Sequence, residues 1–515
     1  MQNHYRVGID AGGTFTDFIL ADRKGEVRIF KALSTPNDPT LAIRNGLKLI
    51  EEETGISPRE IVSNSDLCIN GTTVGLNALI THNGAKTGLI ATKGHEDSIE
   101  IRLGHKEDGY RYDPEYPPAT MLVPRYLRRG VSERVISTGA VQTPLNEEDV
   151  RDACRHFLAE GVDSVAISFV WSVLHPEHEM RAAEIVREMM PNVRLTVGSQ
   201  LYPEVRDYTR SSTSFVNAYL APILTRYVEA VDGYFRSLGA RHPVRYFQSN
   251  GGLALGSVVS DQSVYAINSG PASAPQAALY IAEPWGMKNI ITVDMGGTSF
   301  DITLTRDGRA NVSKNIDFLR YRIGIPMIQV ETLGAGGGSI GWIDSMGLLQ
   351  MGPQSAGSEP GPACYQRGGV HPAITDADLV LGKIDPDNFA GGAIKLSPDA
   401  AKAAILRDVG DRLKLAATPA AFGICEVVDE NMANAARVHA VENGKNISDN
   451  IMVAFGGAAP LHAARLCEKL GIDQCLMRHP PRPQRMQAEH AGRRQQGLAN
   501  TDHLRLFQPG INQLL

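Results

Sequence analysis

The sequence predicts an α/β protein made of two duplicated lobes. One fourteen-residue phrase is written twice, as VGIDAGGTFTDFIL at residues 7–20 and, 284 positions later, as ITVDMGGTSFDITL at residues 291–304. Each copy has the pattern of a strand, a glycine turn and a second strand. Apolar strand segments alternate with amphipathic helical segments around these copies, and such alternation is typical of layered α/β folds.

Each copy of the phrase places a carboxylate directly before a glycine loop. The first copy has Asp10, the loop Gly12-Gly13-Thr14 and then Asp17, and the second has Asp294, the loop Gly296-Gly297-Thr298 and then Asp301. Glycine leaves the backbone free to wrap a phosphate with its N–H groups. A single loop of this kind also fits an ordinary hairpin turn, but its repetition with the same Asp-to-Asp spacing favours two phosphate loops. Two such loops in duplicated halves imply one nucleotide clamped in a cleft between the two lobes.

The elements between the two copies are marked by residues that cap helices and by apolar spacing. We expect helices between Asp38 and Gly55, between Asn146 and Gly161, and from about Pro176 to Met190. The apolar run 165–170 is predicted to be a strand that follows the second of these helices. The stretch 198–210 is expected to cross from the first lobe to the second.

Two further glycine-rich segments follow the second copy of the phrase. The segment Gly334-Ala335-Gly336-Gly337-Gly338-Ser339 has so few side chains that its backbone can approach a ligand closely. A flexible loop is the alternative interpretation. The segment Phe455-Gly456-Gly457-Ala458-Ala459-Pro460 follows the apolar strand 451–455 and opens a helix. A turn of this kind can stack on an adenine ring.

Composition restricts the class of partner. The 515 residues, 43% of them hydrophobic, are enough for two or three domains with substantial cores. The net charge of −6 gives no basic surface for nucleic acid or for an anionic membrane. No apolar run reaches the roughly 18 residues of a membrane helix, and the first residues lack the regions of a signal peptide, so we expect a cytoplasmic protein. The six cysteines form no Cys-x-x-Cys pair, which predicts buried thiols instead of a zinc site.

Several motifs together carry a resemblance to a known family. They are, in chain order, DxGGTFTD, NGTTVGLNALI, SNGG, SGPA, DMGGTSFD, GAGGGS, GPACYQRGG with PAITDADLVLG, and AFGGAAPLHA. With these motifs the chain resembles the hydantoinase A/5-oxoprolinase family over residues 1 to about 476. The resemblance implies the fold of the actin, hexokinase and heat-shock chaperone ATPases, with two ribonuclease-H-like lobes at residues 1–198 and 199–476.

The resemblance implies the use of ATP more firmly than it implies a substrate. The family includes ATP-dependent hydantoinase, oxoprolinase and caprolactamase subunits, and subunits of acetone and acetophenone carboxylases. We therefore expect the ATP-using subunit of a hydrolase that opens a cyclic amide (a hydantoin, 5-oxoproline or a lactam) in a hetero-oligomer with a hydantoinase B-like second subunit. The alternatives are the ATP-using subunit of an acetone- or acetophenone-type carboxylase and a non-catalytic ATPase switch.

The glycine loops and their carboxylates are assigned to an ATP site. Asp10 and Asp294 are expected to hold Mg²⁺, directly or through its waters, and to be the catalytic carboxylates. Asp17 and Asp301 are expected to brace the hairpins. The residues expected to contact ATP are Gly12, Gly13, Thr14, Thr16, Gly296, Gly297, Thr298, Gly334, Gly336, Gly337, Gly338, Gly456 and Gly457.

The segment Asn70–Ile80 is the candidate for contact with the substrate. Thr72, Thr73 and Asn77 would face the cyclic amide there, although the same segment fits a simple turn followed by the start of a helix.

Three other pairs of polar residues each have two interpretations. Glu204 and Arg210 would form an ion pair in the cleft or lie on a solvated helix face, and Asp376 and Asp378 would touch a metal or cap a helix. His175 and His178 lack a third metal ligand nearby, so we expect them on the surface at the start of a helix.

The last segment of the chain departs from the pattern of the family. Residues 478–515 contain six Arg against Glu489 and Asp502, a net charge of +4. A truncation or a change of reading frame near Met477 is the explanation we favour, and a genuine basic interaction tail is the alternative. We expect this tail, residues 477–515, to make few contacts with the lobes. Ala459 also stands where the family often has glycine, which adds a methyl group near the expected adenosine.

Overall fold

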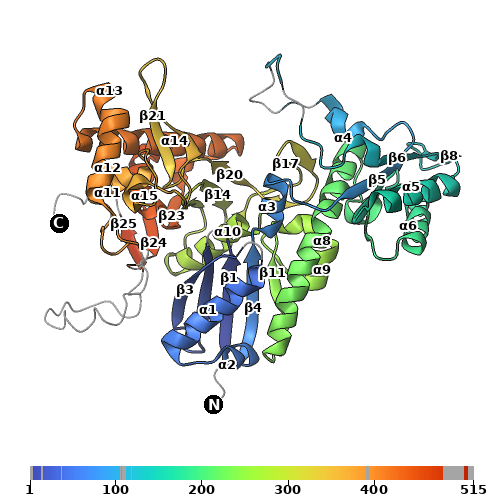
Figure 1. Cartoon of the computed structure of the whole chain (residues 1–515), viewed down its shortest axis with the longest axis horizontal. Helices are drawn as coiled ribbons and strands as arrows, with labels where there is room; N and C mark the ends of the chain where they lie inside the picture. Colours follow the sequence, from blue (N-terminus) through green and yellow to red (C-terminus); the bar gives the residue numbers. More distant parts are fainter. Residues whose placement is uncertain are drawn as a thin grey trace. The chain divides into compact units, whose positions relative to one another are not determined.

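The computed structural model describes residues 4–12, 15–35, 38–104, 106, 112–116, 119–389, 392, 394–478 and 504–507. The chain folds into two compact units, of which the first contains Met1–Ala272 and Val312–Ile328 and the second contains Ser273–Asn311 and Gln329–Leu515. Figure 1 shows the elements of both units, coloured along the chain. Each unit has its own sheet and its own hydrophobic core.

The first unit is built on a six-stranded sheet with the order β12-β11-β4-β1-β2-β3. Its strands are β1 (Tyr5–Ala11), β2 (Phe15–Ala21), β3 (Val27–Leu33), β4 (Ser65–Thr72), β11 (Arg245–Phe247) and β12 (Leu253–Leu255). The helices that accompany it are α1 (Pro39–Thr54), α2 (Pro58–Ser63), α3 (Val74–Ile80), α8 (Asp207–Ser237) and α9 (Gly256–Asp261). In Figure 1, α1 runs along one face of this sheet. Gly46 permits this packing, because a Cβ atom there would lie 2.1 Å from the Phe18 ring.

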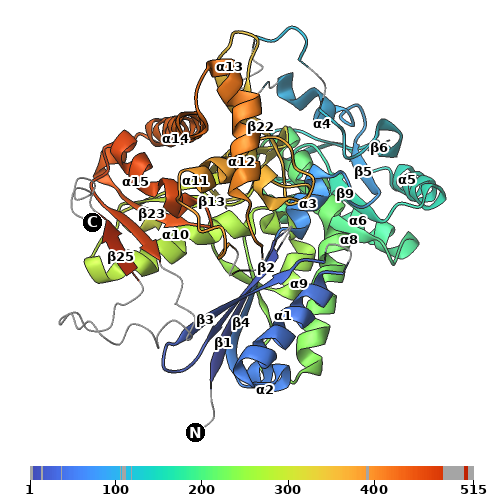
Figure 2. The same ribbon diagram turned by 60° about the vertical axis from the view of Figure 1, so that its left-hand side comes forward.

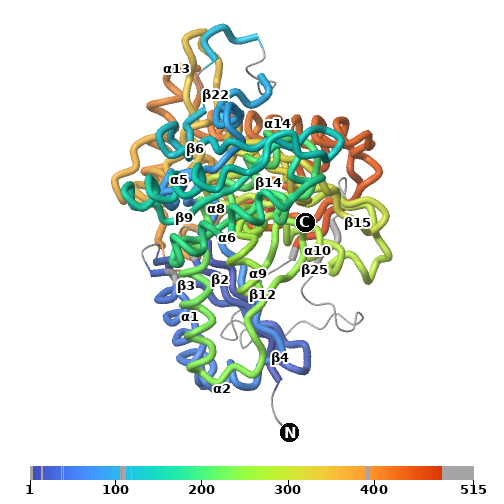
Figure 3. Tube along the Cα trace, turned by 90° about the vertical axis from the view of Figure 1, so that its right-hand side faces the viewer, coloured from blue at the N-terminus to red at the C-terminus, as the bar shows by residue number. Residues whose placement is uncertain are grey.

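The first unit also contains a parallel four-stranded sheet with the order β10-β9-β5-β6. Its strands are β5 (Thr87–Thr92), β6 (Arg128–Val131), β9 (Ser164–Ser168) and β10 (Arg194–Val197), and α5 (Glu147–Glu160) and α6 (Glu177–Met189) pack beside them (Figure 3). Every residue of β5 and β9 is buried, as expected for parallel strands covered on both faces. Smaller elements of this unit are α4 (Ser98–Ile101), α7 (Gly198–Leu201), β7 (Arg134–Val135), β8 (Val141–Thr143), β16 (Val312–Ser313), β17 (Ile316–Phe318), β18 (Tyr321–Ile323) and β19 (Met327–Ile328).

The second unit is built on a sheet with the order β15-β14-β13-β23-β24-β25, in which β20 also pairs with β14. Its strands are β13 (Ile290–Met295), β14 (Phe300–Arg306), β15 (Arg309–Ala310), β20 (Val330–Leu333), β23 (Ile451–Phe455), β24 (Cys475–Arg478) and β25 (Leu504–Phe507). A separate hairpin joins β21 (Ser339–Ile343) to β22 (Leu349–Ser355). The helices are α11 (Ile374–Val380), α12 (Pro398–Ile405), α13 (Asp411–Leu413), α14 (Ala417–Glu442) and α15 (Ala459–Leu470), and Figure 2 shows α15 beside β23. Helix α10 (Ser269–Ala282) contains the boundary between the units.

The duplication predicted from the repeated phrase is confirmed by the strand pairing. In the first unit β1 pairs antiparallel with β2 and parallel with β4, and a turn then leads into α3. In the second unit β13 pairs antiparallel with β14 and parallel with β23, and a turn then leads into α15. The segments NGTTVG and FGGAAP therefore hold equivalent positions in the two halves.

The helices expected from capping residues are confirmed. Asp38 accepts a hydrogen bond from Thr40 N at the start of α1, and Gly55 ends this helix with φ 73°. Asn146 and Gly161 bound α5 in the same way. The predicted strand at 165–170 is observed as β9, which begins one residue earlier and ends two residues earlier than predicted.

The chain passes between the two compact units at positions that differ from the crossing expected near 198–210. Helix α8 follows that stretch and packs against β9, β10 and β18 within the first unit. The passages lie instead at Ala272–Ser273, Asn311–Val312 and Ile328–Gln329. The division into lobes at 1–198 and 199–476 remains a prediction from the sequence.

Part of the basic tail departs from the expectation of few contacts. Leu504–Phe507 forms β25 and pairs antiparallel with β24, from Cys475↔Phe507 to Arg478↔Leu504. Residues 479–503 and 508–515 lie outside the described residues. Within the described part of the chain, no helix is both long enough and apolar enough to cross a membrane.

Candidate functional site

The first hairpin brings two carboxylates together on one face of its sheet. Asp10 and Asp17 are directly opposite in the register of β1 and β2, and Lys31 Nζ lies 2.8 Å from Asp17 Oδ1. Asp10 is exposed to solvent on one side, although protein atoms surround its carboxyl group closely on the others. Burial raises the pKa of Asp10, Asp17 raises it further, and Lys31 offsets part of the increase.

The backbone around Asp10 leaves room for a ligand. A Cβ atom on Gly71 of β4 would lie 3.2 Å from Asp10 Oδ1, so glycine keeps this side of the carboxylate open. At the end of β1, Ser34 Oγ donates to Gly12 O at 2.7 Å and lies 2.9 Å from Thr16 Oγ1. Gly13 and Thr14, which the sequence assigns to the same phosphate loop, lie outside the described residues.

A pocket of about 690 Å³ adjoins this loop within the first unit. It brings together Gly12, Thr16, Thr73 and Asn77, four of the residues singled out from the sequence, with Arg226 of α8. Thr73 Oγ1 donates to Ala11 O at 3.1 Å, and Asn77 Nδ2 donates to Thr73 Oγ1 at 3.3 Å. These bonds attach the turn between β4 and α3 to the carboxyl end of β1. Ligands of α/β proteins commonly bind at this end of the strands.

The pocket differs from the sequence prediction at two residues, because it lacks Thr72 and includes Arg226. Thr72 is 3% exposed and does not line the pocket. Its backbone does not offer an N–H to a ligand either, because its N–H and C=O are both bonded to the Ser269 hydroxyl. Arg226 was not singled out from the sequence. Its position on a long amphipathic helix carries no local signal that distinguishes it from a solvated arginine.

The second hairpin repeats the carboxylate pair with different partners. Asp294 and Asp301 are opposite in the register of β13 and β14. Asp301 accepts hydrogen bonds from Thr332 Oγ1 at 2.6 Å and Ser299 Oγ at 3.4 Å, and burial raises its pKa. Asp294 lies against Gly456, where a Cβ atom would be 2.3 Å from Asp294 Oδ1. The β23–α15 turn therefore approaches this carboxylate through a glycine.

Three glycine segments of the second unit meet at the end of β13 and the loop that follows this carboxylate. Gly337 N donates to Gly296 O at 3.0 Å, and Gly338 N donates to Gly297 O at 2.8 Å. A Cβ atom on Gly336 would lie 2.3 Å from Thr298 N, so only glycine permits this approach. Ala458 N donates to Met295 O at 3.1 Å and attaches the Gly456-Gly457 turn to the same place.

These contacts divide the glycines into two groups. Gly296, Gly297 and Thr298 are exposed, whereas Gly336, Gly337 and Gly338 are buried beneath them. The N–H groups of the buried glycines already donate to protein acceptors, Gly336 N to Ser339 Oγ at 2.9 Å. Gly334 lies before this buried run and stays exposed. Within the exposed loop, Gly296 N donates to Ser299 O at 3.1 Å, so Gly297 and Thr298 are the candidates for backbone donors to a ligand, and the buried run supports them. Ala459 is 0% exposed at the start of α15, so its methyl group packs inside the protein.

A buried ionic network lies behind the glycine segments. His462 of α15 lies between Asp429 of α14, at 2.7 Å from Nδ1 to Oδ1, and Asp378 of α11, at 3.2 Å from Nε2 to Oδ2. Lys383 Nζ contacts Asp378 Oδ1 at 3.0 Å. Despite burial, the two carboxylates raise the pKa of His462 to about 9, and their partners hold the pKa of Asp378 below its ordinary value. The sequence analysis did not assemble this network.

The structure also shows the contacts of the other polar pairs for which the sequence left two interpretations. Asp376 accepts from the backbone N–H groups of Ala363, Cys364 and Ala373, so it caps α11, whereas Asp378 belongs to the ionic network. Arg210 is fully buried and donates to Glu204 through that residue's backbone oxygen at 3.0 Å, and its ion pair is with Asp207 at 2.8 Å. The prediction of a surface position for His178 is wrong, because it is 9% exposed and lies 2.9 Å from Glu133.

The described residues contain no group of three or more His, Cys, Asp or Glu side chains placed to hold a metal. The six cysteines, at 68, 154, 364, 425, 467 and 475, are all free and buried, as predicted. The carboxylate pairs nevertheless fit Mg²⁺, which is commonly bound through one or two carboxylates and its own waters. A cation at the Asp10–Asp17 pair would relieve the repulsion that raises the pKa of Asp10.

Comparison with known proteins identifies the family. The family model described as Hydantoinase/oxoprolinase N-terminal region matches residues 6–190, and the model described as Hydantoinase/oxoprolinase matches residues 210–482. The chain therefore belongs to the hydantoinase/oxoprolinase family. The resemblance inferred from the motifs is confirmed.

Individual relatives extend the match over most of the chain. It is 56% identical to caprolactamase subunit alpha of Pseudomonas jessenii over 476 residues, covering 92% of this chain and 68% of the relative. It is 35% identical to the acetophenone carboxylase gamma subunit of Aromatoleum aromaticum, covering 89% of this chain and 64% of that protein. The chain thus spans about two thirds of the length of these relatives.

Two solved structures share the fold. The crystal structure of the ATP-dependent caprolactamase from Pseudomonas jessenii matches with a TM-score of 0.85 and 56% identity, over 92% of this chain and 68% of that one. A nucleotide-free acetone carboxylase structure matches with a TM-score of 0.78 and 29% identity, over the same shares. The α/β fold with duplicated halves is therefore common to hydrolases and carboxylases that use ATP.

Proposed function

We propose that this chain is the ATP-using subunit of an enzyme that opens a cyclic amide, namely a hydantoin, 5-oxoproline or a lactam. The observation that supports this most directly is the 56% identity to an ATP-dependent caprolactamase subunit over 92% of the chain, together with the two carboxylate hairpins. A lactam is the substrate class nearest to that relative.

In this proposal ATP uses both hairpins. Gly297 and Thr298 supply backbone N–H and hydroxyl donors to the phosphates from the exposed second loop, and the Gly12–Thr16 segment does so from the first. Gly456 and Gly457 form the turn for the adenosine, and the buried Gly336–Gly338 run holds the second loop in place. Asp10 and Asp294 hold Mg²⁺, which neutralises charge on the phosphates.

ATP has a clear chemical purpose in opening an unstrained cyclic amide. Resonance makes the amide carbon a poor electrophile, and the ring keeps the amine close enough to close again. Transfer of the γ-phosphoryl group to the amide oxygen turns that oxygen into a leaving group, and ADP departs. One water then attacks the carbon, and the C–N bond breaks to release the amine and leave an acyl phosphate. A second water hydrolyses the acyl phosphate to the carboxylate and phosphate, so ring opening is coupled to ATP hydrolysis. The protein contributes positioning and charge neutralisation.

Thr73 and Asn77 are proposed to contact the amide substrate. Both line the 690 Å³ pocket beside the first loop, and Asn77 is exposed there. A hydroxyl and a carboxamide match the hydrogen-bonding groups of a neutral amide. Thr72, being buried behind them, is proposed to fix the turn.

The second candidate is the ATP-using subunit of a carboxylase that phosphorylates a ketone enol or bicarbonate. The match to the acetophenone carboxylase gamma subunit and to acetone carboxylase favours it. We further propose a cytoplasmic hetero-oligomer with a hydantoinase B-like subunit, since the relatives are named as subunits.

ATP hydrolysis measured with a panel of cyclic amides, and with ketones plus bicarbonate, tests the proposal. Each reaction is run with and without the partner subunit. Stimulation by an amide alone supports the hydrolase, and turnover that depends on bicarbonate supports the carboxylase. Stimulation by unfolded peptide in place of either would show an ATPase switch and refute both.

A further inference from the structure

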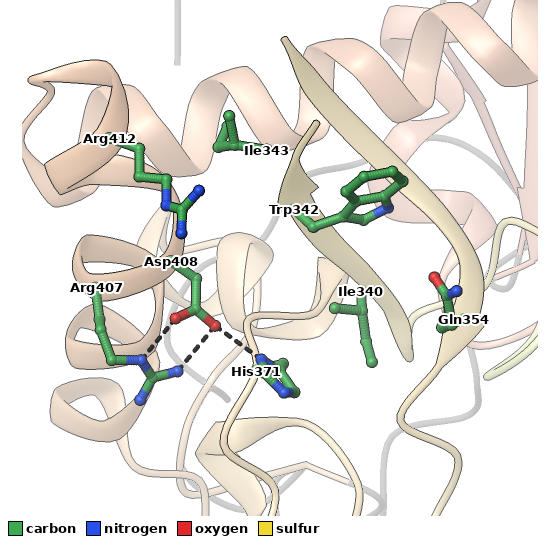
Figure 4. A pocket seen from close by; sticks show the side chains of 9 residues that line it. Ile340, Trp342, Ile343, Gln354, His371, Arg407, Asp408 and Arg412 are labelled. Carbon is green, nitrogen blue, oxygen red and sulfur yellow. Dashed lines mark hydrogen bonds and ion pairs between the residues drawn. The ribbon is translucent and has the colours of Figure 1, made fainter. Parts of the chain in front are cut away.

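A second pocket lies in the second unit, away from the glycine segments. It has a volume of about 530 Å³ and is shown in Figure 4. Ile340, Trp342 and Ile343 line it from the β21–β22 hairpin, and Arg407, Asp408 and Arg412 line it from the helical segment that follows α12. No residue of Gly296–Thr298, Gly334–Gly338 or Gly456–Gly457 lines this pocket, so the proposed ATP site does not use it.

The aromatic wall of the pocket is held in one orientation. Trp342 Nε1 donates to Gly352 O across the hairpin at 2.7 Å. The residue nevertheless stays 40% exposed, which is a large apolar surface left open to solvent. An indole ring that is fixed and exposed is a ready surface for a flat apolar group.

The polar wall is held equally firmly. Arg407 contacts Asp408 with two nitrogens, at 2.6 Å to Oδ1 and 2.9 Å to Oδ2, and His371 Nδ1 lies 2.9 Å from the same Oδ2 (Figure 4). These partners, Arg407 first, keep the pKa of Asp408 below its ordinary value. Residues 406–410 form a π-helical turn, a rare conformation that recurs at functional sites.

Arg412 carries the one charge among the lining residues of this pocket that no described side chain balances. Arg407 is balanced by Asp408, whereas the side chain of Arg412 makes no hydrogen bond or ion pair with any residue that the structure describes. The pocket therefore presents one positive charge beside an apolar wall of Trp342 and Ile340. A cationic ligand is disfavoured, because both oxygens of Asp408 are already bonded.

We propose that this pocket binds an organic carboxylate with a flat apolar body, its carboxylate on Arg412 and its body against Trp342. A guanidinium matches a carboxylate with two parallel hydrogen bonds, and the volume is that of a small-molecule site. One unpaired cation suits a monoanion better than a phosphate dianion. A carboxylate next to a flat apolar group occurs both in small aromatic acids and at the carboxyl terminus of a protein whose last residue is aromatic.

Isothermal titration calorimetry of the full chain with 2-naphthoate tests this, with 2-naphthamide as the neutral isostere. We expect one naphthoate per chain and binding at least about 10-fold weaker for the amide, since charge-assisted hydrogen bonds are the stronger ones. Arg412→Gln and Trp342→Ala should each weaken naphthoate binding by about 10-fold or more. Arg309→Gln, an exposed arginine in the same unit, should leave it unchanged. Circular dichroism confirms the fold of each variant.

A second arm identifies the source of the carboxylate. The peptide Gly-Gly-Gly-Phe is titrated as the free acid and as the carboxyl-terminal amide. Binding of naphthoate alone assigns a small-molecule ligand, and binding of the peptide acid alone assigns the end of a partner chain. Equal binding of acid and amide, unchanged binding in Arg412→Gln, or binding of neither probe would overturn the proposal. None of these outcomes depends on ATP, so they leave the proposed function untouched.

Discussion

In each hairpin the second carboxylate, Asp17 or Asp301, is satisfied by neighbouring protein groups, and those groups differ between the two copies. Lys31 compensates Asp17 in the first copy, whereas the hydroxyl groups of Thr332 and Ser299 compensate Asp301 in the second. The carboxylate on the second strand of the hairpin thus has its partners within the protein in both copies. The carboxylate before the loop, Asp10, instead carries an unfavourable charge. A residue that is unfavourable in the folded protein and placed beside a ligand loop is expected at a functional site.

Asp10→Asn should abolish turnover of Mg-ATP and at the same time stabilise the fold. Folding raises the pKa of Asp10 above 3.8, so the ionised carboxylate destabilises the folded state wherever the group is charged, including pH 7. Replacing it with a neutral side chain removes this penalty. We expect ATPase activity to fall by about 100-fold or more and the melting temperature at pH 7 to rise. Steady-state ATPase assays and differential scanning fluorimetry measure the two effects.

Two companion variants complete this experiment. Asp294→Asn should lose ATPase activity by a similar factor while remaining folded. Asp66→Asn changes an exposed aspartate at the outer end of β4 and should alter neither property. Near-normal ATPase activity in folded Asp10→Asn or Asp294→Asn would contradict the assignment of two phosphate loops.

Gly336→Ala tests the support of the second loop. The new Cβ atom would lie 2.3 Å from Thr298 N, so the loop must shift. We expect a loss of about 1–3 kcal/mol in folding free energy, as for other overpacked sites, and a raised KM for ATP. Gly233→Ala in α8 is the matched control, because nothing lies within 4 Å of its Cβ position and alanine favours a helix. Equal stability and equal KM in both variants would show that the Gly336 contact is unimportant.

At the scale of elements, the buried Asp378–His462–Asp429 network ties α11, α14 and α15 together. Helix α11 holds the buried glycine run, because Thr375 N and Thr375 Oγ1 both donate to Gly337 O at 2.8 Å. Helix α15 continues from the Gly456-Gly457 turn beside Asp294. The network thus connects the two helices that place the glycine segments.

His462 should make the stability of the fold depend on pH in the alkaline range. Its pKa rises from 6.5 to about 9 on folding, so the folded state binds the proton more tightly. The stabilisation is complete below about pH 6.5 and is lost as the pH rises towards 9. Urea unfolding of the wild type should show this decline. His462→Gln should lack the decline and lose about 3–5 kcal/mol at pH 6, because both buried carboxylates lose His462 and only Asp378 keeps another cation, Lys383.

His242→Gln is the control for that titration. His242 is exposed, so its replacement should preserve the wild-type decline. A decline of equal size in His462→Gln would assign the pH dependence to another group.

Local signals account for the elements that the sequence predicted well. Asp38 and Gly55 cap α1, and the repeated phrase specifies both hairpins, because each signal lies within a few residues. The ionic network was missed because Asp378 and Asp429 lie 84 and 33 positions from His462, and only packing brings them together. The burial of His178 was missed for the same reason, since Glu133 lies 45 positions away. The assignment of Gly336–Gly338 to the ATP site stays a prediction, and the sequence did not reveal that their N–H groups donate to protein acceptors.

At the scale of the whole molecule, the duplication gives each unit the same set of parts. Each has a carboxylate hairpin, and each has a parallel strand that leads through a turn into a helix. The two turns have diverged in sequence. The first is Thr72-Thr73 with hydroxyl groups, and the second is Gly456-Gly457 with bare backbone. The proposed function uses this divergence, with the hydroxyl turn facing the amide and the glycine turn facing the adenosine.

If one nucleotide uses both copies, Mg-ATP should protect both phosphate loops from hydrogen exchange. Each loop would contribute backbone N–H groups to the same phosphates, and a bonded N–H exchanges more slowly. Hydrogen-exchange mass spectrometry should show slower exchange at Gly12–Thr16 and at Gly296–Thr298 together, and at the same ATP concentration. Asp10→Asn should weaken the protection of both loops, including the loop in the other unit. Protection confined to one loop would mean that the second copy of the phrase is retained for its fold, and that the nucleotide site belongs to a single unit.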